Sequence, residues 1–537
     1  MHFGMMALGR GTSTRAMMMI ALSALALSAC GAPVRAPGTA VMASGTDLES
    51  GNPLVTVHPL SRQLQRHALF VTLVKLDSLL QPVPYYARRW KWDSTRTSVT
   101  FVLTDQLRWH DGVPTTARDV RFTLDAARNP ELGSPRAGEL QIVDRVEVLE
   151  DTVLRVTFKQ PLTALPTIFA ELPIVPQHRL DSVPRARWRA HAFSTAPVGN
   201  GPFRFVDRIA GRRWRFARND AFPVVMGGPP KLEQIVVAVV DEASTKFAGL
   251  VSGELDLAGV SPTMASLVAR DPTLALITPP ALFSMVLAFN TTRAPFNDAR
   301  VRRAVSMSID KARIVQAAVA GYATPAGGAI PPGLPVRSVG ASGADTTQAD
   351  SLLDVAGWRR NSNRNINGLR ERDGKPLAVT ILTVGSGDMA VEQLVQADLR
   401  ARGFDVGIRV NELATFLSTL RAPSKQFDFA ITGIPGDIAL GHLSALFASA
   451  QRGGALDYTG FHSSLLDDAL LQARRATPTD ANGAWHAVDM QLADSMPVAW
   501  LYHARGVQGR SRRLENVQMD LRGELTSVAQ WTRRSTP

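Results

Sequence analysis

Hydrophobic and polar residues change their spacing along the chain in a way that predicts alternating strands and helices. The runs 70–76 and 99–103 are rich in β-branched and aromatic residues and lie beside turns, which predicts two strands. A helical spacing begins at Ala117, because apolar residues recur three and four positions apart as far as Ala127. Thr116 and Asp119 have the spacing of a capping box, so the helix is predicted to begin there.

The region from residue 379 to residue 431 gives the clearest prediction, because strand and helix patterns alternate there between glycines and polar loops. Strand, helix, strand, helix and strand in this order predict a parallel sheet with right-handed crossovers. Ligands of such sheets bind beyond the carboxyl ends of the strands. The predicted strands are 379–382, 404–410 and 427–431, and the predicted helices are 388–402 and 415–420.

A pair of helices is predicted near residue 300. Asn297 or Asp298 can cap the first helix, and Asp310 can cap the second. The adjacent Arg302 and Arg303 are expected on a solvated face of the first helix, since charged side chains on helices usually face water.

Length and composition indicate a large folded protein. The chain has 537 residues, 45% hydrophobic and 20% charged, which is enough for several domains and too apolar for a disordered chain. The formal net charge is +12, but the basic residues are spread along the chain and form no arm typical of nucleic-acid binding. No nucleic acid is therefore expected as a partner.

The N-terminal segment has the layout of a secretory signal. It has Arg10 and Arg15 near its start, an apolar run over 16–27 and no acidic residue before Cys30. The run is too short to span a bilayer, and it ends in Leu-Ser-Ala-Cys-Gly, which resembles the bacterial lipobox. Residues 1–29 are thus predicted to be a signal peptide and Cys30, the only cysteine, to be lipidated. Residues 30–48, rich in Ala, Gly, Pro and Ser, are expected to form a flexible tether that holds a soluble body to a membrane of the cell envelope.

The sequence carries no local signature of catalysis or metal binding. Its ten histidines show neither His-x-His nor His-Glu-x-x-His spacing, so no metal site is predicted. Signatures of hydrolases, dehydrogenases and P-loop nucleotidases are also missing, and neither a cofactor nor enzymatic activity is expected.

Several short blocks occur together in an order that resembles the family 5 extracellular solute-binding proteins, the peptide and nickel receptors of bacterial ABC importers. The resemblance runs from about residue 70 to residue 502. The chain departs from the family pattern at Asn200, where Thr is usual, and at Ser308, where Ala is expected. The blocks are Trp-His-Asp-Gly at 109–112, Gly-Asn-Gly-Pro-Phe at 199–203, Gly-Glu-Leu-Asp at 253–256, Phe-Asn at 289–290, Val-Arg-Arg-Ala at 301–304 and Ile-Asp-Lys at 309–311.

The resemblance implies an α/β fold with two lobes that close over a ligand by a hinge, the periplasmic-binding-protein clamshell of type II in its large, cluster C form, with mixed or parallel sheets and an extra inserted domain. It also implies a monomer that delivers its ligand to two permease subunits with cytoplasmic ATPases. The expected divisions are lobe I at 49–76, 197–275 and 500–537, the extra domain at 77–196 and lobe II at 276–499.

The resemblance further implies a ligand-binding role for Asp437 and its neighbour Gly436. In the dipeptide and oligopeptide receptors, an Asp in a Gly-Asp step at this point pairs with the α-ammonium group of the ligand. Gly-Asp is also a common turn, so a purely structural role stays open. The expected ligand is a peptide or similar amine-bearing solute; a nickel chelate, haem or an oligosaccharide is the alternative, and a ligand sensor or an enzyme on this fold is a further one. Trp500 and Tyr502 are expected to pack in the core or hinge.

Overall fold

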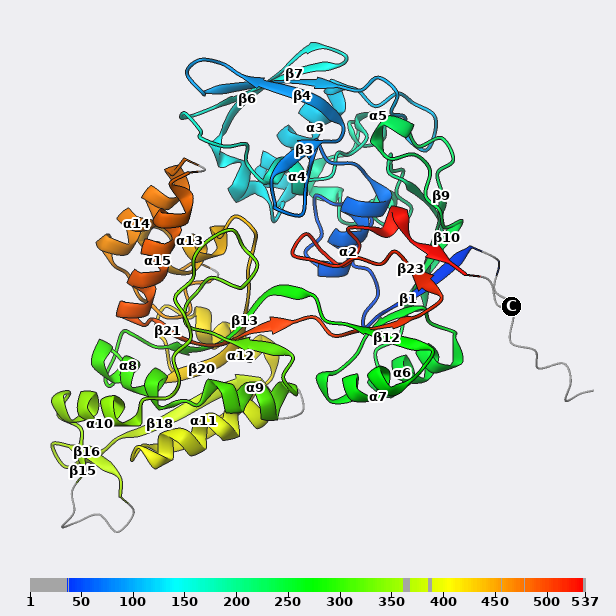
Figure 1. Ribbon diagram of the computed structural model, residues 1–537. Coiled ribbons are helices and arrows are strands. Elements are labelled where there is room, and N and C mark those ends of the chain that lie inside the picture. Colours follow the sequence, from blue (N-terminus) through cyan, green and yellow to red (C-terminus); the bar gives the residue numbers. More distant parts are fainter. Residues whose placement is uncertain are drawn as a thin grey trace, which may run out of the picture.

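The computed structural model describes residues 36, 38–360, 368–384, 389–454, 456–477 and 479–534. Three large sheets organise these residues, and Figure 1 shows them in separate parts of the molecule. Within the described residues, no helix is long and apolar enough to cross a membrane. Cys30, the predicted lipidation site, lies outside the described residues.

A seven-stranded sheet forms the base of the first lobe. Its spatial order is β12-β22-β11-β1-β10-β9-β8, so strands from both ends of the chain lie side by side. Helices α6 (Ala243–Ser252) and α7 (Ala265–Arg270) pack against its β11–β12 end. The strands are β1 (Thr39–Ser44), β8 (Phe203–Ile209), β9 (Arg213–Arg218), β10 (Gln234–Val239), β11 (Leu257–Gly259), β12 (Leu274–Ile277) and β22 (Gln508–Ser511).

The predicted tether is wrong in its second half, because β1 lies in the middle of this sheet. Thr39 to Ser44 pair in parallel with β10 along their whole length, and Met42 pairs with β11 on the other side. Ala40 and Met42 are buried. The composition of the segment is that of a linker, but its alternation of small and apolar residues suits a strand between two neighbours.

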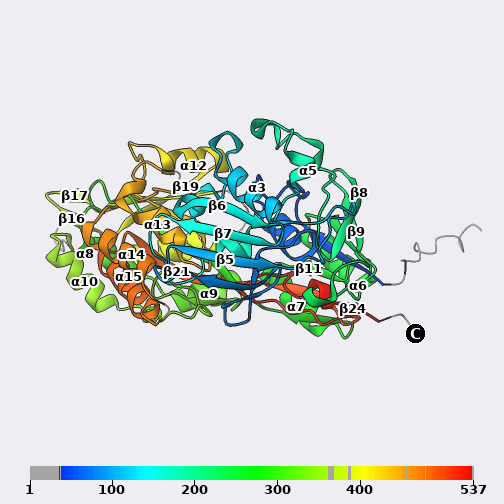
Figure 2. The ribbon, with the colours of Figure 1, turned by 90° about the horizontal axis from the view of Figure 1, so that it is seen from above.

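A four-stranded antiparallel sheet, ordered β4-β5-β7-β6, forms the centre of the inserted domain. Helix α3 (Ala117–Arg128) covers its inner face and begins with the predicted capping box of Thr116 and Asp119, which confirms that prediction. Figure 2 shows β5, β6 and β7 in front with no helix over them. The hydrophobic core of this domain is continuous with that of the first lobe. The strands are β4 (Ala87–Trp92), β5 (Ser98–Leu103), β6 (Val143–Glu150) and β7 (Val153–Phe158).

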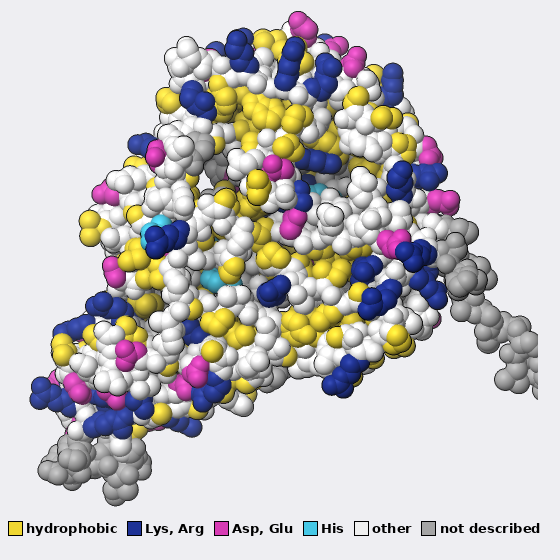
Figure 3. Space-filling model, viewed as in Figure 1, with side chains coloured by type: hydrophobic (Ala, Val, Ile, Leu, Met, Phe, Trp, Pro, Cys, Tyr) yellow, Lys and Arg dark blue, Asp and Glu magenta, His cyan; other side chains and the backbone are white. Residues whose placement is uncertain are grey.

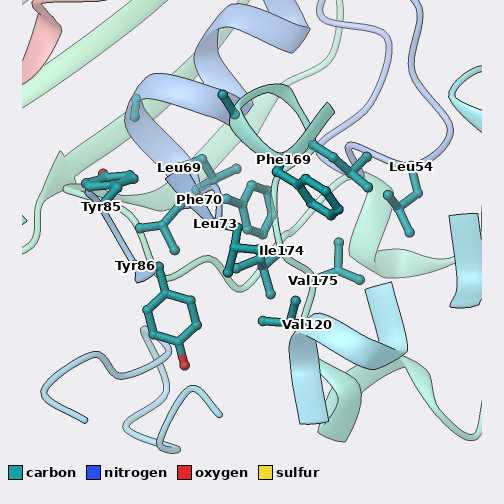
Figure 4. Packing of buried hydrophobic residues seen from close by; sticks show 14 of the residues in the cluster. Leu54, Leu69, Phe70, Leu73, Tyr85, Tyr86, Val120, Phe169, Ile174 and Val175 are labelled. Carbon is teal, nitrogen blue, oxygen red and sulfur yellow. The ribbon is translucent and has the colours of Figure 1, made fainter. Parts of the chain in front are cut away.

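The predicted strand over 70–76 is confirmed only at its end, as β2 (Val74–Leu76), which pairs with β3 (Pro82–Pro84). Residues 70–73 are a buried extended segment outside any sheet, and the buried amide of Asn200 accepts a hydrogen bond from the Val71 N–H at 2.9 Å. Figure 4 shows how closely this segment packs, with Leu69, Phe70 and Leu73 beside Phe169, Ile174 and Val175.

The Gly-Asn-Gly block lies against the same segment. A Cβ atom at Gly199 would meet the Leu69 carbonyl oxygen at 2.0 Å, and one at Gly201 would meet the Ala68 carbonyl oxygen at 2.4 Å. Only glycine fits where two backbones approach this closely, so the block is structural.

The second lobe contains a six-stranded mixed sheet, ordered β14-β21-β13-β20-β18-β19. Strand β18 pairs in parallel with both β19 and β20, with α11 (Ala390–Ala401) and α12 (Leu413–Arg421) as crossovers, which confirms the predicted parallel unit. Strand β13 runs antiparallel to β20 and β21. The strands are β13 (Pro280–Phe289), β14 (Ala323–Pro325), β18 (Ala378–Val384), β19 (Asp405–Asn411), β20 (Phe429–Pro435) and β21 (Val498–Arg505).

The predicted helix pair is α8 (Ala299–Ser308), capped by Asp298, and α9 (Lys311–Val319), capped by Asp310. The expectation that Arg302 faces solvent is wrong. Its side chain is buried and donates to the carbonyl oxygens of Phe296, Ser495 and Met496, so it joins α8 to the end of α15 (Ala481–Ser495).

The remaining elements are short or peripheral. The helices are α2 (Pro59–Leu64), α4 (Ile168–Glu171), α5 (Gln177–Leu180), α10 (Thr346–Val355), α13 (Gly441–Phe447) and α14 (Ser464–Arg475). The strands are β15 (Arg359–Arg360), β16 (Arg370–Arg372), β17 (Lys375–Pro376), β23 (Leu514–Glu515) and β24 (Thr532–Arg533).

Candidate functional site

Two adjacent chain crossings connect the lobes. The first joins β12 to β13 through Thr278 and Pro279, and the second joins β21 to β22 through Gly506. The Gly506 N–H donates to the Pro279 carbonyl at 2.8 Å, and the Arg505 guanidinium donates to the Thr278 carbonyl at 2.6 Å. These bonds tie the two crossings together between the lobes.

Trp500 and Tyr502 both lie in β21, so the chain is still in the six-stranded sheet at the point where a return to the first lobe was expected. We propose that the lobe boundary lies after Arg505. Both side chains are buried, 2% and 5% exposed, in the two cores that flank the sheet, which confirms that they pack in the interior.

Asp437 follows β20, which extends to Pro435 and is thus longer than the predicted strand ending at Ile431. Pairing with β13 accounts for the difference, since Phe283 and Pro435 are still in register. The Gly436 N–H then donates to the Leu282 carbonyl at 2.8 Å. Asp437 therefore lies just beyond the carboxyl end of a strand whose parallel neighbour is β18, the position where sheets of this kind bind ligands.

The Asp437 carboxylate holds the start of α13 (Gly441–Phe447). It accepts hydrogen bonds from the N–H groups of Gly441 at 2.9 Å and His442 at 2.8 Å, and its Oδ2 lies 3.2 Å from the His442 Nδ1. Burial would raise the pKa of this carboxyl group, but the hydrogen bonds and the His442 charge outweigh burial and lower the pKa. The side chain is 39% exposed, so an ionised oxygen remains open to a ligand.

The geometry at Gly436 does not indicate a ligand-binding role for this residue. A Cβ atom there would make ordinary contacts, 3.4 Å from the His442 ring and 3.6 Å from the Leu282 Cβ. Space alone does not require glycine at this position.

A group of charged side chains from the first lobe and the inserted domain lies opposite the Asp437 loop. We call this group the charged wall; it consists of Arg62, Arg66, Arg136, Glu139 and Glu171. Glu171 is its centre, at 2.7 Å from Arg136, 3.5 Å from Arg66 and 3.7 Å from Arg62, and Arg136 also pairs with Glu139 at 2.7 Å.

The charged wall and Asp437 are close enough to interact electrostatically. Asp437 contributes to the pKa of both Arg136 and Glu139 from the other lobe. Burial would raise the pKa of Glu171, but the adjacent Arg66 and Arg136 lower it, so this carboxylate is ionised. Figure 3 shows acidic and basic side chains gathered near the middle of one face, beside a hollow in the surface.

Sequence reasoning did not find the charged wall. Arg62 and Arg66 are four residues apart and Arg136 and Glu139 three apart, the spacings of helical neighbours, but these short segments carry little amphipathic pattern. Their common partner Glu171 is more than thirty residues from either pair. Only the tertiary fold brings them together.

The lobes also touch beyond the hinge. Thr163 of the inserted domain donates its hydroxyl hydrogen to the Ala476 carbonyl at 2.6 Å, at the end of α14. Leu80, in the β2–β3 turn, packs against the core of the second lobe. The structure thus has the two lobes in contact on the side away from the hinge.

Other polar pairs do not resemble a catalytic or metal site. The Ser284 hydroxyl lies 2.8 Å from the His503 Nδ1, but both residues are buried, and burial together with the Lys311 charge lowers the pKa of His503 to about 4. Across the described part of the chain, no three His, Cys, Asp or Glu side chains are grouped to hold a metal ion.

Comparison with known proteins gives consistent matches over most of the chain. The model of the bacterial extracellular solute-binding proteins, family 5, matches residues 81–451. The glutathione-binding protein GsiB of Pectobacterium atrosepticum is 26% identical over 497 residues, which cover 90% of this chain and 92% of GsiB.

Two solved structures have the same two-lobed α/β fold. NikA from Brucella suis, in complex with Fe(III)-EDTA, is 20% identical with a TM-score of 0.80, and the match covers 92% of this chain and 100% of NikA. The oligopeptide-binding protein AppA from Bacillus subtilis, in complex with a nonapeptide, is 21% identical with a TM-score of 0.76, and the match covers 93% of this chain and 99% of AppA.

Proposed function

Because the chain belongs to the family 5 extracellular solute-binding proteins, we propose that it captures a peptide or similar amine-bearing solute between its lobes and delivers it to an ABC importer. One observation carries the choice of ligand: Asp437 presents an ionised, partly exposed carboxylate beyond the end of β20, facing the other lobe. A carboxylate partly removed from water binds a cation more strongly than a fully exposed one does. The relatives described as glutathione-binding and oligopeptide-binding support the same class.

The proposed mechanism is closure around the ligand. The two tied crossings allow the lobes to rotate, and the ligand's ammonium group binds Asp437 while the rest of the ligand lies against the charged wall. Main-chain hydrogen bonds, as in an added strand, would supply affinity with little side-chain selectivity. The proposal includes no catalytic step, and the permease and its ATPases are the expected partners.

Location follows from the family in part, since its members are extracellular binding proteins. We add to the proposal that residues 1–29 are removed on export and that a lipid on Cys30 anchors a monomeric body to the membrane. Mass spectrometry of the membrane-extracted protein tests this directly, and Cys30→Ser is expected to release the protein from the membrane fraction.

A melting-temperature screen tests the ligand class. The chain from Gly31 onward, which includes every described residue, is mixed with di- to hexapeptides and with N-acetylated forms of the same peptides. A ligand at 100 times its Kd is expected to stabilise the fold by about 2.7 kcal/mol. The expected result is a shift with free peptides that acetylation abolishes.

The variant Asp437→Asn separates binding from folding. It keeps an acceptor for α13 and removes the charge, so we expect the peptide shift to be lost and the ligand-free protein to remain folded. The matched control is Asp467→Asn, because Asp467 also accepts a backbone N–H, that of Ser449 at 2.8 Å, away from the site. Equal shifts with acetylated peptides would contradict the role of Asp437.

The same screen includes nickel with histidine, haem and oligosaccharides. Solved structures of this fold contain Ni(L-His) and Fe(III)-EDTA, so a chelate is the alternative ligand class. A shift with a chelate, unchanged in Asp437→Asn, would favour that alternative.

A further inference from the structure

The outer face of the four-stranded sheet forms a groove far from the charged wall in the fold. Its volume is about 780 Å³. Side chains on all four strands line it, and we call it the sheet groove. The side chains on this face are those of Thr97, Ser98, Thr100, Thr157, Arg89, Lys91, Arg145 and Arg155.

Strand register places these side chains in rows across the sheet. Lys91, Thr100 and Arg155 are direct neighbours on β4, β5 and β7, so the two cations lie on either side of a hydroxyl. Two strand spacings, about 10 Å, separate their backbones. A second row consists of Ser98, Thr157 and Arg145.

The cations of the sheet groove are only partly neutralised. Among the described residues no carboxylate forms an ion pair with Arg89, Lys91 or Arg155. Glu147 is the cross-strand neighbour of Arg155 and pairs with Arg145 at 3.4 Å, so four cations face two carboxylates, those of Glu147 and Asp93. The single acidic residue of the lining, Asp93, is occupied by Thr95, Thr97 and the Ser98 N–H. The groove is therefore a positively charged, hydroxyl-rich surface that no helix covers.

We infer that the sheet groove binds an acidic polysaccharide. Ser and Thr hydroxyls both donate and accept hydrogen bonds, as sugar hydroxyls do, and the cations match carboxylates along such a chain. A flat bilayer does not fit a concave surface, and an acidic peptide that extended the sheet would bind its edge rather than its face.

Calorimetric titration of the chain from Gly31 onward with polygalacturonate tests this inference. We expect saturable binding that weakens as salt rises from 50 to 500 mM, because salt screens exposed charges. The double variant Lys91→Gln/Arg155→Gln should lose at least about tenfold in affinity. Thr100→Val/Thr157→Val, which leaves the charge unchanged, should lose about fivefold.

Matched controls separate the groove from the general charge of a +12 chain. Arg179→Gln/Arg187→Gln removes two exposed cations elsewhere in the inserted domain and should change affinity less than twofold. Fully methyl-esterified polygalacturonate should not bind. Three results would each overturn the inference: no binding of polygalacturonate, equal losses of affinity in Lys91→Gln/Arg155→Gln and Arg179→Gln/Arg187→Gln, or equally tight binding of polyglutamate. All substituted side chains lie on the surface, so the variants should melt at the same temperature as the parent protein.

Discussion

Asp437 stabilises its own loop with the carboxylate that we propose binds the ligand. Burial opposes its ionisation, but the hydrogen bonds from His442 and Gly441 lower its pKa below the ordinary 3.8. A carboxyl group with a lowered pKa in the folded state contributes stability that is present above pH 3.8 and is lost as pH falls through the lowered value. We predict that wild type melts above Asp437→Asn at pH 5 and that this margin narrows as pH falls below 3.8. Calorimetry over that pH range measures the difference in melting temperature. A difference that is unchanged at pH 3 would contradict the lowered pKa of Asp437.

At the scale of elements, the sequence predicts those helices and strands that local patterns determine, and it does not predict those that depend on distant partners. The unit from β18 to β20 and the cap of α3 were predictable because their signals lie within a few residues. Strand β1 was not, because its partner β10 is about 195 residues away. Neither was the buried state of Arg302, because two of its three acceptors lie at the end of α15. We predict that Arg302→Met lowers the free energy of unfolding by about 3 kcal/mol, since three carbonyl groups, that of Phe296 buried and those of Ser495 and Met496 partly buried, lose their donor. The control Arg303→Met should not lower the free energy of unfolding, because the buried Nε of Arg303 has no hydrogen-bond partner among the described residues for the substitution to remove. Urea unfolding compares the two.

At the scale of the whole molecule, the lobes are joined by two chain crossings at the hinge and by non-covalent contacts at the opposite side. The Thr163–Ala476 hydrogen bond forms only when the inserted domain meets α14, so it stabilises the closed arrangement alone. Its loss should favour the open form by about 1 kcal/mol, or about fivefold. We predict that Thr163→Val binds ligand more weakly, by at most about fivefold, and gives a larger radius of gyration by X-ray scattering, with an unchanged melting temperature. Thr167→Val, in the same domain, is the control and should match wild type; similar behaviour of the two variants would mean that the contact does not stabilise closure.

The central position of β1 bears on the lipid anchor that we propose at Cys30, because it leaves few residues between the two. If a lipid is attached to Cys30, only the residues up to Thr39 separate it from the middle strand of a sheet, and such a chain spans at most about 30 Å even when fully extended. The body is then confined to a thin layer above the bilayer, with the β1 end of the first lobe always nearest the lipid. Confinement of this kind raises the effective concentration of the receptor around a membrane transporter. A protein confined in this way would diffuse in the two dimensions of the membrane plane instead of in three. It would then approach its permease in a fixed orientation.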